Sequence, residues 1–516
     1  MARRFLAISP WPGAIAAGVL ALFAFGTLVA VALRADSGSG LGPFDLAALR
    51  FTVMQAAMSA ALSVVLAAPV ARALARRTFA GRGLLIALMG APFVLPVIVA
   101  VLGLTAVFGR NGPIAQMAIW AGFEPFSIYG LQGILLAHVF FNLPLATRLI
   151  LQGWQEVPAE QMRLAASLGF GRWDMFRHIE MPMLRRVLPG AAAAIFLICT
   201  TSFAVALTFG GGPAATTIEL AIYEAFRFDV DLGRAAILAL MQFGIGIVAV
   251  VITLRVVLPD FATPRRDRTQ VWHGAQSGWT RGLDGCVIGL AALFLILPLA
   301  LLALRGVSGF GQLDGSIGAA AVRSVGVALV STVLTLVLVI ALSLAVLRWN
   351  WVESLGLVTI STSPLVMGTG LFLIVYPFVD PRVIALPVTV AVNAIMSVPF
   401  ALRAILPALR SVEADFGRLG DALGLVGLAR LRWLVLPRLR RPIGFAAGLT
   451  AALSMGDLGV ITLFADPDAA TLPLKVYQLM SAYRMDQAMA AALVLLALTL
   501  GLFYLFDRWG QRDDRL

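Results

Sequence analysis

Long apolar runs separated by short polar segments alternate along the whole of this 516-residue chain. A run of roughly 20 apolar residues is long enough to cross the hydrocarbon core of a bilayer as a helix. We therefore predict an all-α integral membrane protein with about 12 transmembrane helices, six in each half of the chain. The predicted spans are 13–33, 51–71, 84–108, 130–150, 187–209 and 235–257 in the first half, and 286–304, 322–346, 355–378, 382–402, 442–464 and 488–506 in the second.

The composition excludes a soluble globule. Hydrophobic residues make up 60% of the chain and charged residues 13%, so there is too little polar surface to coat a water-soluble domain. The first apolar run follows Arg3 and Arg4 as a signal peptide would, but it is longer than the usual stretch of about 7–15 residues, which favours a retained helix. The two cysteines, Cys199 and Cys286, predict neither a disulfide framework nor a metal site.

Basic residues gather in alternate loops. If the N-terminus is cytoplasmic, the inside segments hold 29 of the 39 Lys and Arg residues, and an excess of basic residues marks cytoplasmic loops. This pattern predicts a multi-pass membrane protein with cytoplasmic N- and C-termini. We therefore interpret the net charge of +12 as a topology signal and expect no nucleic-acid partner.

One polar loop occurs twice, 255 residues apart. The first copy reads RLAASLGFGRWDMFRHIEMPMLRR from Arg163, and the second reads RLGDALGLVGLARLRWLVLPRLRR from Arg418. In each copy a helix is expected to end at a glycine, which adopts positive φ readily. A proline then precedes the next membrane helix. A duplicated loop rich in arginine predicts a short helix at the membrane surface that binds a partner.

Six spans in each half give the two halves the same orientation. Parallel repeats of this kind are related by a pseudo-two-fold axis along the membrane normal, with a pathway at their interface. We predict a first half over 1–257 with its polar loop at 151–186, and a second half over 286–516 with its loop at 403–441. A basic segment rich in Gly and Pro, 258–285, is predicted to be a cytoplasmic linker.

The duplicated loop resembles the EAA loop of ABC importer permeases, which docks on the ATPase subunit. In that family a glycine is followed ten residues later by Ile or Leu, then by a hydrophobic residue and Pro. Arginine stands where the family motif begins with an acid, and Gly420 replaces an alanine. The resemblance and the shared register assign coupling to the ATPase to these residues: Arg163, Ala165, Gly169, Arg177, Ile179, Pro182, Arg418, Gly424, Arg432, Leu434 and Pro437. Arg177 and Arg432 also suit anionic lipid heads.

The resemblance extends over almost the whole chain. Two fused six-helix halves are similar to the iron(III) and thiamine branch, and the segments SFAVALTFGGGPAATTIELAIYEAF, SMGDLGVITLF and TLPLKVYQ resemble thiamine permeases. The resemblance implies a type I ABC importer permease of the bacterial inner membrane that carries thiamine and its phosphates by alternating access. It also implies two copies of a cytoplasmic ATPase and a periplasmic substrate-binding protein as partners, besides membrane lipids.

This chain is expected to bind no ATP. A phosphate-binding loop needs a lysine directly after a glycine, and the only lysine, Lys475, follows Leu474. The chain is therefore predicted to be no enzyme and to bind no cofactor, because ATP is used by the partner subunits.

Five polar residues inside predicted spans are candidates for the translocation pathway: His138, Asn142, Asn393, Ser397 and Asp457. Residues four apart share a helix face, and hydrogen bonding between helices explains the first four equally well. A carboxylate within the membrane is costly, so Asp457 either faces a cationic thiazolium or is held by neighbouring backbone amides or a basic residue.

Three other kinds of protein share some of these features. A twelve-helix secondary transporter also has parallel halves, but its acidic loop after the second helix is missing from ARALARRTFAGRG. A membrane-embedded enzyme lacks support because three histidines are scattered through the chain. An iron(III) permease is the main alternative, since the cargo also depends on the external binding protein.

Overall fold

The computed structural model describes residues 9, 11–35, 42–90, 92, 94–210, 212–255, 278–349, 351–353, 356, 359, 362–380, 383–464 and 469–511. Regular structure in these ranges is helical throughout, and they contain no strand. Eleven helices in the described ranges are long and apolar enough to cross a membrane. The all-α membrane fold predicted from the apolar runs is confirmed.

The helices follow one another closely along each half. In the first half they are α1 (Trp11–Arg34), α2 (Pro43–Arg76), α3 (Arg82–Leu88), α4 (Val97–Phe108), α5 (Pro113–Trp120), α6 (Leu131–Glu156), α7 (Ala159–Ser167), α8 (Arg172–Met175), the π-helical turn η2 (Phe176–Glu180), α9 (Met181–Thr200), α10 (Phe203–Phe209), the 3₁₀ turn η3 (Pro213–Ala215), α11 (Ile218–Arg227) and α12 (Leu232–Arg255). In the second half they are α13 (Gly278–Gly309), the 3₁₀ turn η5 (Phe310–Gln312), α14 (Gly315–Val346), α16 (Pro364–Val375), α17 (Ala385–Ala422), α18 (Gly427–Arg430), the π-helical turn η6 (Leu431–Val435), α19 (Leu436–Met455), α20 (Gly459–Phe464), α21 (Leu472–Ser481) and α22 (Met485–Gln511).

Several predicted boundaries are wrong. The run at 84–108 is divided into α3 and α4, and α4 begins after Pro96, which has no N–H to continue a helix. Within the described residues, the run at 355–378 contains α16, whose 12 residues extend only about 18 Å. Residues 258–277 of the predicted linker lie outside the described ranges, and its last part, 278–285, is already helical in α13.

The second part of each half repeats the same order of elements. A π-helical turn, a long helix, a break, two short helices and a final long helix occur in both halves. The turn η2 begins at Phe176 and η6 begins at Leu431, 255 residues later. The helices that follow them, α9 and α19, are both 20 residues long. The internal repeat of the loop therefore extends to the helices that follow it.

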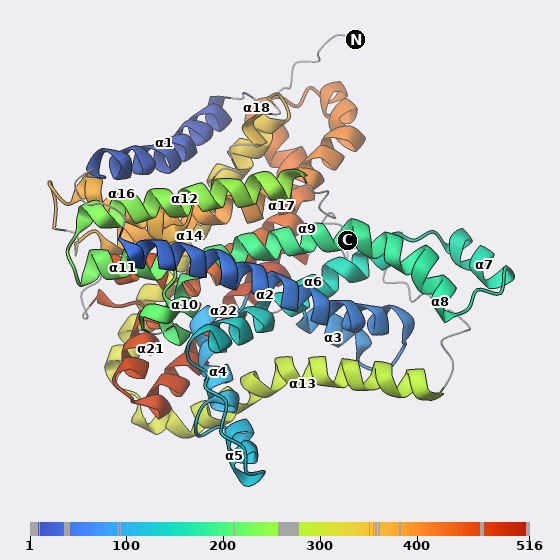
Figure 1. Cartoon of the computed structure of the whole chain (residues 1–516). Helices are drawn as coiled ribbons and strands as arrows, with labels where there is room; N and C mark the ends of the chain where they lie inside the picture. Colours follow the sequence, from blue (N-terminus) through green and yellow to red (C-terminus); the bar gives the residue numbers. More distant parts are fainter. Residues whose placement is uncertain are drawn as a thin grey trace.

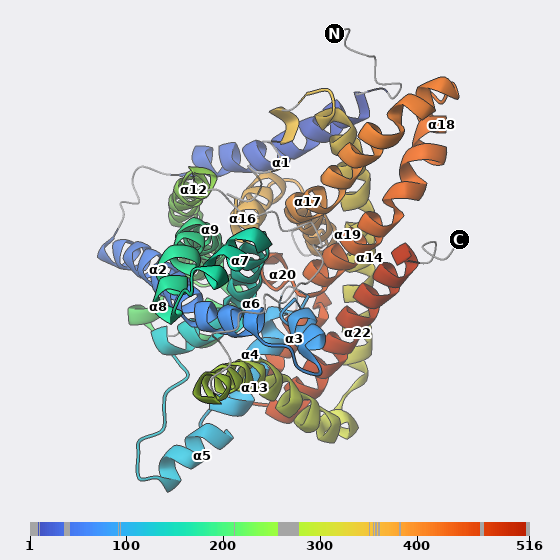
Figure 2. The ribbon, with the colours of Figure 1, turned by 90° about the vertical axis from the view of Figure 1, so that its right-hand side faces the viewer.

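The first helix of each half crosses to the other half. Helix α1 packs on α14 and α16, while α13 packs on α2 and α4 as well as on α22. Figures 1 and 2 show α1 and α13 on opposite sides of the bundle. Small residues allow these backbones to approach closely: a Cβ at Gly13 would lie 2.4 Å from the Ala341 carbonyl oxygen, and one at Gly103 would lie 2.8 Å from that of Pro298.

Both copies of the polar loop lie at one end of the bundle. Near the start of α13, Asp284 accepts a hydrogen bond of 2.7 Å from Arg77, just after α2 and close to the first loop. The end of α13 packs at Gly309 on the start of α22, so α22 runs back and its Gly510 contacts Gly444, close to the second loop. In Figure 1 both loops lie toward the right-hand side, α7 and α8 at the edge and the second copy in orange above them.

The close contact of α1 with α14 predicts a stability effect. Gly13→Val would place side-chain atoms on the backbone of α14, and overpacking of this kind costs about 1–3 kcal/mol. We expect Gly13→Val to lower the melting temperature of the detergent-purified protein. Gly18→Val is the matched control on the same helix, because a Cβ there meets no atom within 4 Å among the described residues. Equal melting temperatures for the two variants would contradict the packing of α1.

Candidate functional site

The two polar loops share one backbone geometry. Gly169 has φ +66° and Gly424 has φ +65°, which confirms the predicted positive φ at both glycines. After Gly169 the N–H of Phe170 donates to the Ala165 carbonyl at 3.0 Å, and after Gly424 the N–H of Leu425 donates to the Gly420 carbonyl at 2.9 Å. These bonds are those of a Schellman motif, so each glycine ends the helix before it and turns the chain.

The prolines of both loops lie in the first turn of the following helix. Pro182 and Pro437 occupy this position in α9 and α19, directly after a helical turn, where a proline cannot donate the backbone bond of a regular α-helix. Immediately before them, the N–H of Met181 bonds to the Phe176 carbonyl and the N–H of Leu436 bonds to the Leu431 carbonyl. The helix axis is therefore widened into a π-helical turn at the same place in each half.

Most residues assigned to coupling are exposed, and neither loop is buried among the spans. The exposed ones are Arg163, Gly169, Arg177, Pro182, Arg418, Gly424, Arg432 and Pro437. Ala165 and Leu434 are buried beneath the surface, and Ile179 is half-buried. Arg163, where the family motif begins with an acid, lies 3.5 Å from Glu160 in an exposed pair, which contributes little stability.

The loops also expose apolar side chains in matching positions, although these residues are not among those assigned to coupling from the sequence. Leu168 is 63% exposed and Leu423 is 65% exposed, while Trp173 and its counterpart Leu428 are 66% and 82% exposed. Each pair is 255 residues apart. Apolar side chains that protrude at equivalent places indicate a contact surface for a partner. The 255-residue spacing between the two loops is enough to identify these positions as equivalent.

A buried charge anchors each loop, but in a different way. In the first loop, Glu180 at the end of η2 forms ion pairs with Arg76 and, at 2.9 Å, with Arg72 of α2. In the second loop, Arg430 of α18 lies 2.6 Å from both Glu413 and Asp421 of α17. The first anchor joins the loop to another membrane helix, whereas the second holds the loop to the helix that precedes it.

Gly420, which replaces an alanine, lies beside the second anchor. The residue of the first loop that corresponds to Arg430 is Met175, and both are buried. A Cβ at Gly420 would lie 2.9 Å from Leu434 and 3.5 Å from the guanidinium of Arg430. Glycine therefore makes room for the side chain of Leu434, and the guanidinium of Arg430 lies at ordinary contact distance beside it.

Four of the five polar residues predicted for the pathway lie in pairs on α6 and α17. His138 is within 2.9 Å of Ser59 on α2 and 2.8 Å of Ser202 after α9. Asn142 donates to the Cys199 sulfur at 3.3 Å, and Asn393 donates to Ser454 at 3.0 Å. Ser397 is buried. His138, Asn142 and Asn393 therefore form hydrogen bonds between helices, which is one of the two interpretations given for these residues.

Asp457 lies in the break between α19 and α20. Its Oδ1 accepts a hydrogen bond of 3.2 Å from the backbone N–H of Gly459, as the interpretation based on backbone amides expects. Its Oδ2 is buried and has no hydrogen-bond partner in the described part of the chain. The local backbone therefore accounts for one of the two carboxylate oxygens of Asp457, and Oδ2 is left without a partner in the described residues.

A cavity of about 150 Å³ is lined by this break and by the equivalent break between α9 and α10. Ser202 lies 255 residues before Asp457, so the two occupy the same position in their halves. Phe203 and Glu219 also line the cavity. Glu219 was not predicted from the sequence, although an acid close after Thr216 and Thr217 in an apolar segment was a usable signal.

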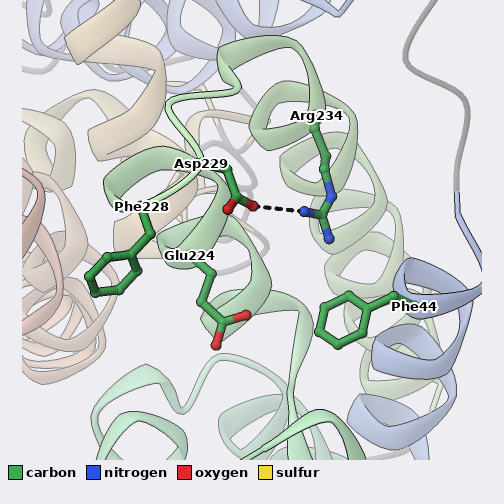
Figure 3. Close-up of a pocket in the computed structure, with 5 residues that line it drawn as sticks. All are labelled: Phe44, Glu224, Phe228, Asp229 and Arg234. Atoms are coloured by element: carbon green, nitrogen blue, oxygen red, sulfur yellow. Dashed lines mark hydrogen bonds and ion pairs between the residues drawn. The ribbon is translucent and has the colours of Figure 1, made fainter.

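A larger pocket of about 530 Å³ opens at the opposite end of the bundle from the loops. Figure 3 shows Phe44, Glu224, Phe228, Asp229 and Arg234 around it. Arg234 lies 2.9 Å from Asp229 and its guanidinium carbon lies 5.6 Å from the Phe44 ring centroid. Burial, and secondly the charge of Asp229, raise the pKa of Glu224 above its usual range. These contacts join α2, α11 and α12 at this end.

The two anchors predict an asymmetric response to exchanging their central residues. Met175→Arg would bury a charge in the first loop without the two acids of the second, and an uncompensated buried charge costs about 3–5 kcal/mol. Arg430→Met leaves Glu413 and Asp421, which are partly exposed and stay solvated, so we expect a loss of about 1 kcal/mol. Thermal unfolding of both purified variants measures the difference. A smaller loss for Met175→Arg than for Arg430→Met would be incompatible with these anchors.

Comparison with known proteins identifies the family. Residues 62–268 match the family model described as "Binding-protein-dependent transport system inner membrane component". A thiamine transport system permease protein of Brucella abortus (strain 2308) is 38% identical over 97% of this chain and 95% of its own length.

Two further relatives define how far the similarity extends. The thiamine transport system permease protein of Salmonella typhimurium is 38% identical over 99% of both chains. A molybdenum transport system permease protein of Azotobacter vinelandii is 30% identical over 35% of this chain and 80% of its own length. The chain therefore belongs to the family of ABC importer permeases, the inner-membrane components of binding-protein-dependent transport systems, and its near full-length relatives are thiamine transport permeases.

Proposed function

We propose that this chain is the membrane subunit of an ATP-driven importer that carries thiamine and its phosphates across the bacterial inner membrane by alternating access. The observation that carries this proposal is the pair of exposed loops with one geometry at one end of the bundle. Relatives of nearly the same length whose printed names give thiamine transport support the choice of cargo.

Each loop binds one copy of a cytoplasmic ATPase subunit in this proposal. The protruding apolar side chains Leu168 and Trp173, with Leu423 and Leu428, enter the ATPase surface. Arg177 and Arg432 are exposed beside them and contact the same subunits. Ala165, Ile179 and Leu434 lie beneath and keep the docking segment in shape.

The loop end of the bundle faces the cytoplasm. The sequence pattern supports this orientation, because the segments predicted to be inside hold 29 of the 39 basic residues. Both chain termini are then cytoplasmic. A periplasmic binding protein delivers the cargo at the other end, where the pocket of Figure 3 opens.

The two halves, 1–257 and 286–516 with the linker 258–285 between them, rock against each other around the cavity at their interface. ATP binding draws the ATPase subunits and the two loops together, and release lets them separate. A ligand shifts such an equilibrium only if it binds one conformation more tightly than the other. Asp457 lines the pathway, while His138, Asn142, Asn393 and Ser397 hold the helices beside it.

The docking role predicts loss of uptake from one substitution in either loop. Gly169→Asp or Gly424→Asp puts a charged side chain at positive φ, which costs about 1–2 kcal/mol, and in the middle of the apolar contact. We expect at least a tenfold loss of uptake and of co-purified ATPase, with normal insertion in the membrane. Uptake in membrane vesicles and pull-down of the ATPase measure these effects.

Gly81→Asp is the matched control for both variants. Gly81 is also exposed, has φ +88° and meets no atom within 4 Å of an added Cβ among the described residues. It lies at the same end of the bundle but outside the loops. Wild-type ATPase binding in both loop variants, or an equal defect in the control, would refute the docking role.

Reconstitution tests the cargo directly. The permease, its ATPase and its binding protein in proteoliposomes are expected to accumulate radiolabelled thiamine when ATP is supplied to the ATPase side. Accumulation of iron(III) without thiamine would overturn the proposed cargo and leave the importer mechanism in place. Thiamine uptake without ATP would instead favour a secondary transporter.

A further inference from the structure

Glu219 is the most deeply buried acid that the mechanism above does not use. It is 1% exposed and lies in the first turn of α11, after the capping residue Thr217. Neither of its carboxylate oxygens has a hydrogen-bond partner within the described ranges, and none of the ion pairs found there includes it. The Ser363 hydroxyl, at the start of α16, is a polar neighbour.

Folding alone gives no reason for a carboxylate at this place. Removing a charge from water without a partner is costly, and the dipole of α11 compensates only a small part of the cost. A neutral side chain of the same shape would be less costly here. A buried acid that weakens the fold is typical of a functional site.

Asp457 brings a second carboxylate to the same cavity from the other half. Its unpartnered Oδ2 is buried, and both acids line the space between the two helix breaks. Two carboxylates in one cavity repel each other unless one of them is protonated or a positive charge lies between them, and only a bound cation lets both stay charged. The arrangement therefore favours a cation at the interface of the halves.

The remaining lining selects the kind of cation. The Phe203 ring, packed edge to face against Tyr223 at 5.4 Å between centroids, borders the cavity, and aromatic faces attract organic cations. No group of three or more His, Cys, Asp or Glu side chains suited to a metal occurs among the residues described. The cavity has about the volume of five water molecules, enough for one aromatic ring.

We propose that Glu219, Asp457 and Phe203 form a transient binding site for an aromatic organic cation at the junction of the two halves. The inference rests on the proposed function, because the thiazolium ring of thiamine is such a cation. The two acids offset the cost of bringing its charge into the membrane, and the ring of Phe203 covers its face. As the halves separate, the cavity opens to admit the rest of the molecule.

The test uses the complete complex of permease, ATPase and binding protein in proteoliposomes. Glu219→Gln and Asp457→Asn are each expected to lower ATP-driven thiamine uptake tenfold or more. Glu219→Asp keeps the charge and is expected to retain a several-fold higher rate than Glu219→Gln. The control is Asp507→Asn near the end of α22, an acid outside both pockets that accepts a hydrogen bond from Gln511, and it should stay within twofold of the wild type.

Thermal stability separates binding from a structural role. Removing an unpaired buried charge should leave the melting temperature of Glu219→Gln unchanged or raised. A lowered melting temperature together with lost uptake would show that the carboxylate is structural and overturn the site. Normal thiamine uptake in both variants would overturn it too while leaving the proposed function intact. A wild-type complex that transports no thiamine would overturn the proposed function itself, and the inference with it.

Discussion

Every backbone N–H and C=O inside a hydrocarbon layer needs a hydrogen-bond partner from the protein, and this constraint organises the whole structure. Helices satisfy it within themselves, so non-helical backbone at membrane depth is tolerated only inside the protein or beside a cavity. The breaks after α9 and α19 obey this rule, because they line one cavity together. This cavity lies where two membrane helices are interrupted.

The repeat of the two halves does not make them equivalent. Their loops share the glycine turn and the π-helical turn, yet the first is tied to α2 through Glu180 and the second to α17 through Arg430. A displacement of the first loop therefore acts directly on α2, which is not one of the helices that carry the loop. A displacement of the second reaches the bundle through the long helix that carries it. Gene fusion allows such differences, because each half always meets the same partner half.

The amino-acid pattern predicted the broad architecture well because membrane helices are set by length and hydrophobicity alone. The repeated loop predicted the positive φ of Gly169 and Gly424. The predicted boundaries of α4 and α16 were wrong because hydrophobicity alone does not mark where a helix ends within an apolar run. The surroundings of Glu219 and the ion pairs of Glu180 with α2 depend on contacts between distant segments, which no local pattern contains.

The crossing of α1 and α13 has a consequence for how the protein is made. When α1 leaves the ribosome, the helices that will cover it, α14 and α16, are not yet synthesised. The face of α1 that packs on α14 and α16 must therefore contact lipid or an insertion factor until the second half has been synthesised. Because each half completes the other's surface, neither is expected to survive quality control alone. Joining them in one polypeptide guarantees their equal supply during biogenesis.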